Sequence, residues 1–158
     1  MGTVTMDFIA QGERAGTWAM VLVEEGPWPL AEVEANLRRL QERMYGCVEA
    51  AVNGQLAELY PETHGGQVIV RLDGYDLPQA EVREFFECFS SGVLDVPDYA
   101  SALAEKRWVS GVQFELNLEH LKHWAARVSM RPNPSIEWTF QRPLRALWPA
   151  AHVERWAP

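Results

Sequence analysis

Acidic residues that end two of the expected strands are the first candidates for chemistry in this sequence. Glu24 and Glu25 close the segment TWAMVLVEE, and Asp73 and Asp76 lie at the end of QVIVRLDGY. Paired carboxylates can serve as acid and base in glycoside hydrolysis, or can bind a cation. They are equally typical of a solvated rim, and Asp76 is well placed to cap the helix that follows it. We favour the structural role and keep Asp73 with Asp76 as an alternative catalytic pair.

A second candidate for chemistry is the histidine pair of the segment EHLKH. His120 and His123 are three residues apart, which places both on one face of a helix, and Glu115 could add an oxygen ligand. The order does not match the HExxH zinc motif, and the sequence has no GxSxG, GxGxxG or phosphate-binding loop. We therefore predict no catalytic residue, metal or cofactor. A small hydrolase or metal-dependent enzyme that uses Glu115, His120 and His123 remains the alternative.

The distribution of charge favours a protein partner. The 158 residues have a net charge of −8, with 8 basic and 20 acidic residues from Met1 to His120 but 6 basic and 2 acidic residues from Leu121 to Pro158. An acidic body repels phosphate backbones and attracts basic surfaces, so we expect a basic protein partner and no nucleic acid. The acidic residues expected to contact that partner are Glu24, Glu25, Asp73, Asp76, Glu81, Glu84 and Glu87.

The C-terminal segment differs in composition from the body. SIEWTFQRPLRALWPAAHVERWAP combines three tryptophans with three arginines. One interpretation is that it covers a sheet face that the helices leave bare, and the other is that it forms an interface arm, for which Trp138 and Trp148 are the candidates. We predict an α+β domain at residues 1–128 and an extension at residues 129–158 that packs on it. An oligomer that exchanges this extension between subunits also remains open, and the oligomeric state is not predicted.

Hydrophobic periodicity predicts the order β-β-α-β-α-α-β. Alternation predicts strands at Thr3 to Ala10, Thr17 to Glu25, Gln67 to Tyr75 and in GVQFELNLEH. Apolar residues at three- and four-residue steps predict one long helix from Leu30 to Ala51, and others in DLPQAEVREFFECFSSGVL and DVPDYASALAEKRW. The predicted fold is α+β, with an antiparallel or mixed sheet of about four strands and two main helices on one face.

The compartment is predicted to be the cytoplasm. The longest aliphatic run, Ala19 to Val23, is too short to span a bilayer, and the N-terminus has no basic region before an apolar stretch. We therefore expect no membrane partner. Cys47 and Cys88 are the two cysteines and have no CxxC neighbour, so we expect reduced thiols.

Several segments together resemble a family of small bacterial domains of unknown function found near polymorphic toxin systems. The similar segments are MDFIA, AMVLVEEGPW, GQLAELYPETHGGQVIVRL and the helix after DLP, within Met6 to Leu118. The chain departs from the pattern between Val93 and Ser110 and in its C-terminal extension. The resemblance implies an immunity-like protein that neutralises a toxin by occluding it, and it carries over no catalytic residues.

Overall fold

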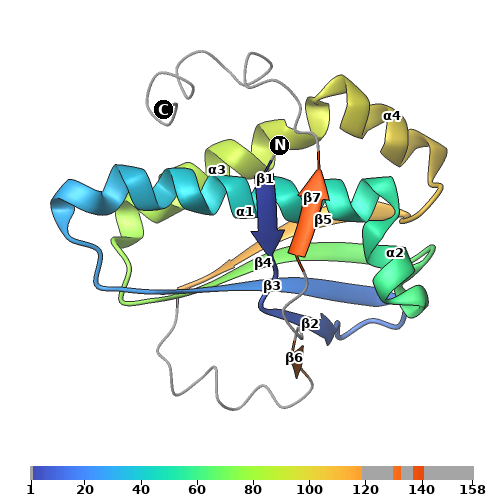
Figure 1. Ribbon diagram of the computed structural model, residues 1–158, viewed down its shortest axis with the longest axis horizontal. Helices are drawn as coiled ribbons and strands as arrows, with labels where there is room; N and C mark the ends of the chain where they lie inside the picture. Colours follow the sequence, from blue (N-terminus) through green and yellow to red (C-terminus); the bar gives the residue numbers. More distant parts are fainter. Residues whose placement is uncertain (1, 119–129, 133–136, 141–158) are drawn as a thin grey trace.

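The computed structural model describes residues 2–118, 130–132 and 137–140 of the chain, and its main feature is a mixed sheet with strand order β5-β4-β3-β2-β6 (Figure 1). Strands β3, β4 and β5 are parallel, whereas β2 is antiparallel to both β3 and β6. The bounds are Phe8–Gln11 for β2, Thr17–Glu25 for β3, Gln67–Tyr75 for β4, Gly111–Asn117 for β5 and Met130–Pro132 for β6.

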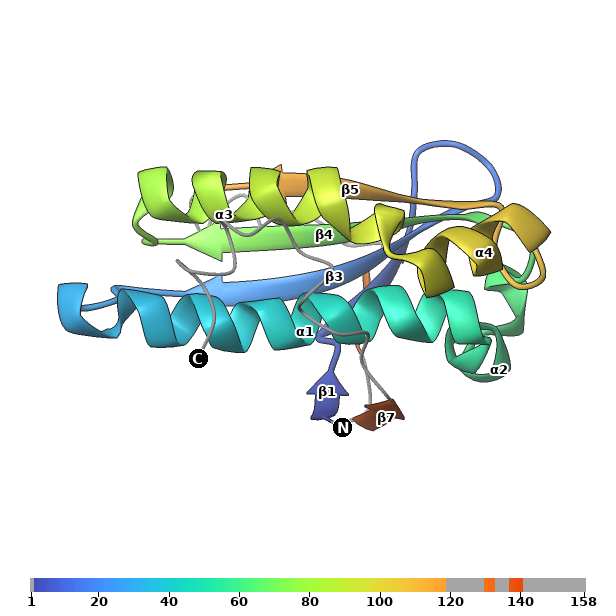
Figure 2. The same cartoon turned by 90° about the horizontal axis from the view of Figure 1, so that it is seen from above.

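The two main helices, α1 and α3, lie side by side on one face of this sheet (Figures 1 and 2). They form the connections from β3 to β4 and from β4 to β5, which is how parallel neighbours are joined. The helices are α1 (Val33–Asn53), α2 (Gln55–Leu59), α3 (Gln79–Gly92) and α4 (Pro97–Glu105), with the 3-10 turns η1 (Leu30–Glu32), η2 (Pro61–Thr63) and η3 (Val93–Asp95). The prediction of an α+β fold, with an antiparallel or mixed sheet and two main helices on one face, is confirmed, and of the two sheet types it is the mixed one that is present.

Alternation along the strands builds the main core between the sheet and the helices. The register aligns Leu22 of β3 with Leu72 of β4 and Leu116 of β5, and the first two of these side chains are fully buried. Phe89 of α3 packs edge-on against Phe114 of β5, with ring centroids 5.8 Å apart. A smaller cluster, which includes Ala19 and Val21, lies on the opposite face.

The prediction of one continuous strand from Thr3 to Ala10 is wrong. The structure has β1 at Gly2–Thr5 and β2 at Phe8–Gln11, and Met6 between them is fully buried. Strand β1 leaves the main sheet and pairs antiparallel with β7 (Glu137–Phe140), next to α1 on the side away from α3 (Figure 2). Two segments of the C-terminal extension thus pair with the N-terminal strands: β6 with β2, and β7 with β1.

The start of α3 also differs from the prediction. Asp76 does not cap the helix; it lies outside it with φ of 59°, and Pro78 is the N-cap residue without a side-chain cap hydrogen bond. Helix α1 ends at Asn53, and Gly54 is its C-cap residue. Gly54 has φ of 96°, and a Cβ there would lie 2.7 Å from the ring of Trp108, so both conformation and space require glycine.

The two cysteines are free thiols, Cys47 buried and Cys88 half-buried. Within the described ranges, no helix combines the length and the apolar character needed to cross a bilayer.

Candidate functional site

The carboxyl ends of β3 and β4 lie at the same end of the molecule as the starts of α1 and α3 (Figures 1 and 2). This follows from the connectivity, because each helix begins a few residues after the strand that precedes it. Ligand sites of open sheets with parallel strands commonly lie at this edge. It is also where the sequence predicted a concentration of acids.

The segment from Gly26 to Glu32 crosses this edge and is held close to β4. The Gly26 N–H donates to the Tyr75 carbonyl at 2.7 Å. A Cβ at position 26 would lie 1.8 Å from the Asp76 carbonyl oxygen, so the close approach requires glycine. Trp28 is half-buried against the core, whereas Leu30 is 89% exposed. A fixed loop therefore presents one large apolar side chain to the exterior.

Carboxylates are frequent in the segments that meet at this end of the molecule. We use the name acidic edge for Leu30 together with six acids from the end of β3, the residue after β4, η1 and the first two turns of α1 and α3. All six are exposed except Glu81, which is half-buried: Glu25, Glu32, Glu34, Asp76, Glu81 and Glu84. Glu34 pairs with Arg38, one turn further along α1. The predicted Glu87 is also exposed and lies further along α3.

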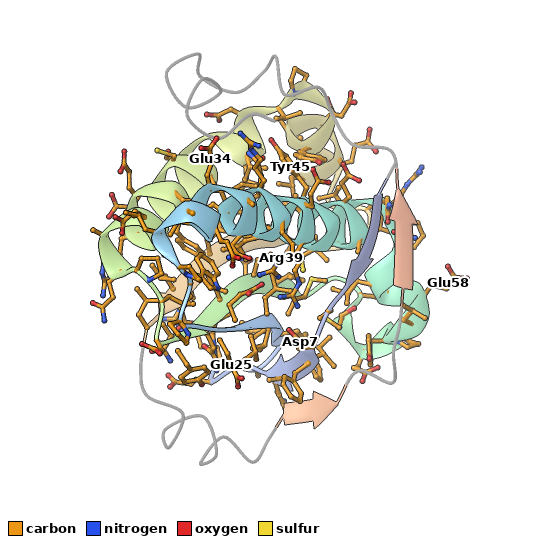
Figure 3. The ribbon with its side chains drawn as sticks, turned by 60° about the vertical axis from the view of Figure 1, so that its left-hand side comes forward. Asp7, Glu25, Glu34, Arg39, Tyr45 and Glu58 are labelled. Atoms are coloured by element: carbon orange, nitrogen blue, oxygen red, sulfur yellow. The ribbon has the colours of Figure 1, made fainter. Side chains whose placement is uncertain are left out.

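Glu24, by contrast, points into the protein and is only 4% exposed. Both of its oxygens accept from Arg39, at 2.7 and 2.8 Å, and one also accepts from Arg43 at 2.8 Å. Arg43 continues to Asp7, whose carboxylate accepts the Val23 backbone N–H at 2.8 Å. We call these four side chains the Asp7–Arg43–Glu24–Arg39 network (Asp7 and Arg39 are labelled in Figure 3). It joins α1 to β3 and to Asp7, the residue before β2, so Glu24 belongs to the interior rather than to the acidic edge.

Burial and the charges of this network together shift the pKa values of Arg43 and of the nearby Cys47. Burial lowers the pKa of Arg43, but the charges of Asp7 and Glu24, and their hydrogen bonds to it, outweigh burial and raise that pKa. For the fully buried Cys47 thiol, whose charged form is an anion, burial has the opposite effect and raises the pKa to about 12, although the charge of Arg43 acts to lower it. Cys47 therefore stays protonated and is a poor nucleophile.

This raised pKa predicts a specific loss of stability in alkali. In the unfolded chain the Cys47 thiol ionises near 9.0, whereas in the folded protein it ionises near 12. The unfolded state therefore releases its proton first, and the free energy of unfolding falls as the pH rises through this window. Between about pH 8 and 10, we expect the wild type to lose about 1 kcal/mol more than Cys47→Ala, measured by urea denaturation under reducing conditions. Equal losses in the two proteins would contradict this assignment.

Asp73 is a second buried acid, with 0% exposure. It receives two hydrogen bonds from Arg71 two residues earlier on β4, at 3.0 and 3.1 Å. Residues two apart on a strand share a face, and this pair lies on the face opposite the helices. Asp73 and Asp76 are therefore in different environments, one ion-paired inside the protein and the other exposed.

Of the remaining predicted residues, the structure describes Glu115 and Trp138. Glu115 is exposed on β5, Trp138 lies in β7, and His120, His123 and Trp148 lie outside the described residues. Across the parts of the chain that the structure describes, no three His, Cys, Asp or Glu residues are grouped so that they could hold a metal.

Sequence reasoning missed three features of this region. Leu30 was assigned to the apolar stripe of the long helix, but Pro29 and the 3-10 turn place it before α1 begins. The partners Arg39 and Arg43 carried no sequence signal, since they are 15 and 19 residues from Glu24. Arg71 could have been found, because its two-residue spacing from Asp73 on a strand puts the two side chains on one face.

The fold and this edge define a small α+β protein with an acidic surface at the carboxyl end of its parallel strands. Comparison of the chain with family models, curated proteins and solved structures gives no match.

Proposed function

We propose that this chain is a protein-binding module for a basic protein surface and, more specifically, an immunity protein that neutralises a cognate toxin by covering its active site. The observation that supports this most directly is the acidic edge, where Leu30 is 89% exposed at the same end of the molecule as six carboxylic acids. An exposed apolar side chain on a surface rich in charge matches the usual composition of a protein interface, with its apolar centre and polar rim.

The two components of the edge would contribute differently. Full burial of a leucine side chain is worth about 1.5–3 kcal/mol, and Leu30 has nearly all of that surface still to bury. Exposed carboxylates add less affinity, but they accelerate association with a basic partner and disfavour acidic ones. Leu30 would therefore determine how slowly the complex dissociates, and the acids how quickly it forms.

The loop is also suited to binding because it is held in place before a partner arrives. The Gly26 hydrogen bond to Tyr75 and the packing of Trp28 fix it at two points before Leu30. A preorganised loop loses little conformational entropy on binding. Basic residues are typical of sites that bind nucleic acid, so a toxin that cleaves nucleic acid would present the complementary charge. The proposal places both proteins in the cytoplasm.

Charge reversal at the acidic edge tests the proposed surface. The tagged wild type is used to capture its partner from source cells, and the partner is then purified for titration against variants. Glu25→Lys combined with Glu32→Lys is expected to weaken binding about tenfold and to flatten its salt dependence. Leu30→Ala is expected to weaken binding to a similar extent at all salt concentrations.

The matched control combines Glu13→Lys with Glu58→Lys, which changes the net charge equally at exposed positions away from the edge (Glu58 is labelled in Figure 3). This control should bind nearly as well as the wild type. If it loses as much affinity as the edge variant, net charge rather than the acidic edge governs binding. The immunity function has a separate test: the captured partner should arrest growth when expressed alone, and co-expression of the wild type, but not of the edge variant, should restore it.

A further inference from the structure

Strand β5 forms one margin of the main sheet (Figure 2). One of its sides is hydrogen-bonded to β4 over the whole length Gly111–Asn117, and no strand among the described residues pairs with the other side. Such an edge offers a row of backbone N–H and C=O groups to another strand. On the face opposite the helices, its polar side chains Gln113 and Glu115 are both exposed.

Among the described residues, the β5 edge has few of the features by which proteins usually block edge pairing. It contains no proline, lysine or arginine, its one charged residue is Glu115, and its register with β4 runs without a bulge. Val112, Phe114 and Leu116 face the helices and are buried or half-buried, so the strand itself is fixed in the core. The edge is long and regular. Of the three parallel strands, β5 is the one with a side that pairs with no described strand.

We propose that the β5 edge is the site at which a second copy of this chain binds, by antiparallel β5–β5 pairing about a two-fold axis. The axis stands perpendicular to the sheet, so each face of one sheet continues into the same face of the other. Residues that lie opposite each other must then share a face, and the axis must pass through a residue position.

The sequence of β5 is complementary to itself in one of these registers. With the axis at Phe114, all seven residues pair, Val112 lies opposite Leu116, and Gln113 lies opposite Glu115 of the other copy. The Gln113 amide can donate to that carboxylate in two symmetric pairs. An axis at Glu115 would set two carboxylates directly opposite each other, and an axis at Gln113 would pair only five residues. The Phe114 register therefore combines the longest pairing with a favourable arrangement of charge.

This assembly is independent of the acidic edge. Because the two copies of β5 run in opposite directions, their carboxyl ends and their acidic edges point to opposite ends of the joined sheet. A dimer formed in this way could bind two partners.

The test exploits the exposed Gln113–Glu115 pairs, which can be changed without disturbing the core. Sedimentation equilibrium of the full chain from about 1 µM to 1 mM should show a monomer–dimer equilibrium for the wild type. Gln113→Glu creates two like-charge pairs and is expected to raise the dissociation constant about three- to tenfold. Gln113→Lys places a positive charge opposite Glu115 of the other copy and should lower the dissociation constant.

The double variant Gln113→Glu with Glu115→Lys restores opposite charges and should dimerise at least as well as the wild type. Gln79→Glu makes the same chemical change at an exposed position on α3 and should leave the dissociation constant unchanged. A single-chain mass at every concentration would overturn the proposal. So would a dimer whose dissociation constant does not follow the sign of the charges at positions 113 and 115.

Discussion

Replacing Arg43 by methionine is expected to lower the free energy of unfolding by about 3–5 kcal/mol. The Arg43 side chain is only 16% exposed and bonds to both Asp7 and Glu24. Methionine keeps the aliphatic stem but leaves Asp7 without a guanidinium and Glu24 with the guanidinium of Arg39 alone. Removing one partner from a buried ion pair is far more costly than the pair was worth, because the charge left behind cannot recover its hydration.

Arg39→Met is the matched control for this variant. Arg39 also bonds to Glu24, but its side chain is 49% exposed, so water screens the interaction and the expected loss is about 1 kcal/mol or less. Urea denaturation followed by circular dichroism measures both variants, with equal slopes required for a valid comparison. Equal losses in the two variants would show that burial of the Asp7–Arg43–Glu24–Arg39 network does not govern its contribution to stability.

Asp73→Ala is expected to cost a comparable amount, about 3–5 kcal/mol. The substitution leaves the Arg71 guanidinium, 16% exposed, without the carboxylate that accepts two of its N–H groups. Arg71→Met is expected to lower the free energy of unfolding by the same amount, because it leaves the Asp73 carboxylate without the Arg71 guanidinium. Urea denaturation of the two single variants compares the losses.

The double variant Arg71→Met with Asp73→Leu separates the charge effect from packing. It removes both charges at once beside the apolar cluster that includes Val23 and Ile69, so it should be more stable than either single variant. If the double variant loses the sum of the two single losses, the residues do not interact and the ion pair has no energetic role.

The buried acids Glu24 and Asp73 show why the candidate site was only partly predictable. The sequence predicts both as surface residues because acids at strand ends are usually solvated. Whether a carboxylate is exposed depends on the residues that face it, and for Glu24 those residues come from another element. The exposed acids Glu25, Asp76 and Glu84 lie where the sequence suggested, since a strand end and the outer face of a helix are fixed by local periodicity.

The sequence by itself determined the type and order of the main strands and helices from β3 to β5. Alternation in TWAMVLVEE and three- and four-residue spacing in the long helix are local patterns, because the strand and helix repeats fix which side chains share a face. It left open whether the sheet was antiparallel or mixed, and its alternation predicted a single strand where the structure has β1 and β2. Tertiary structure decided those points, since strand direction follows from where the helical connections pack, and β1 leaves the sheet to pair with β7. It also decided that Glu24 and Asp73 are buried with arginines while Leu30 is exposed, because burial is a property of the whole packed chain.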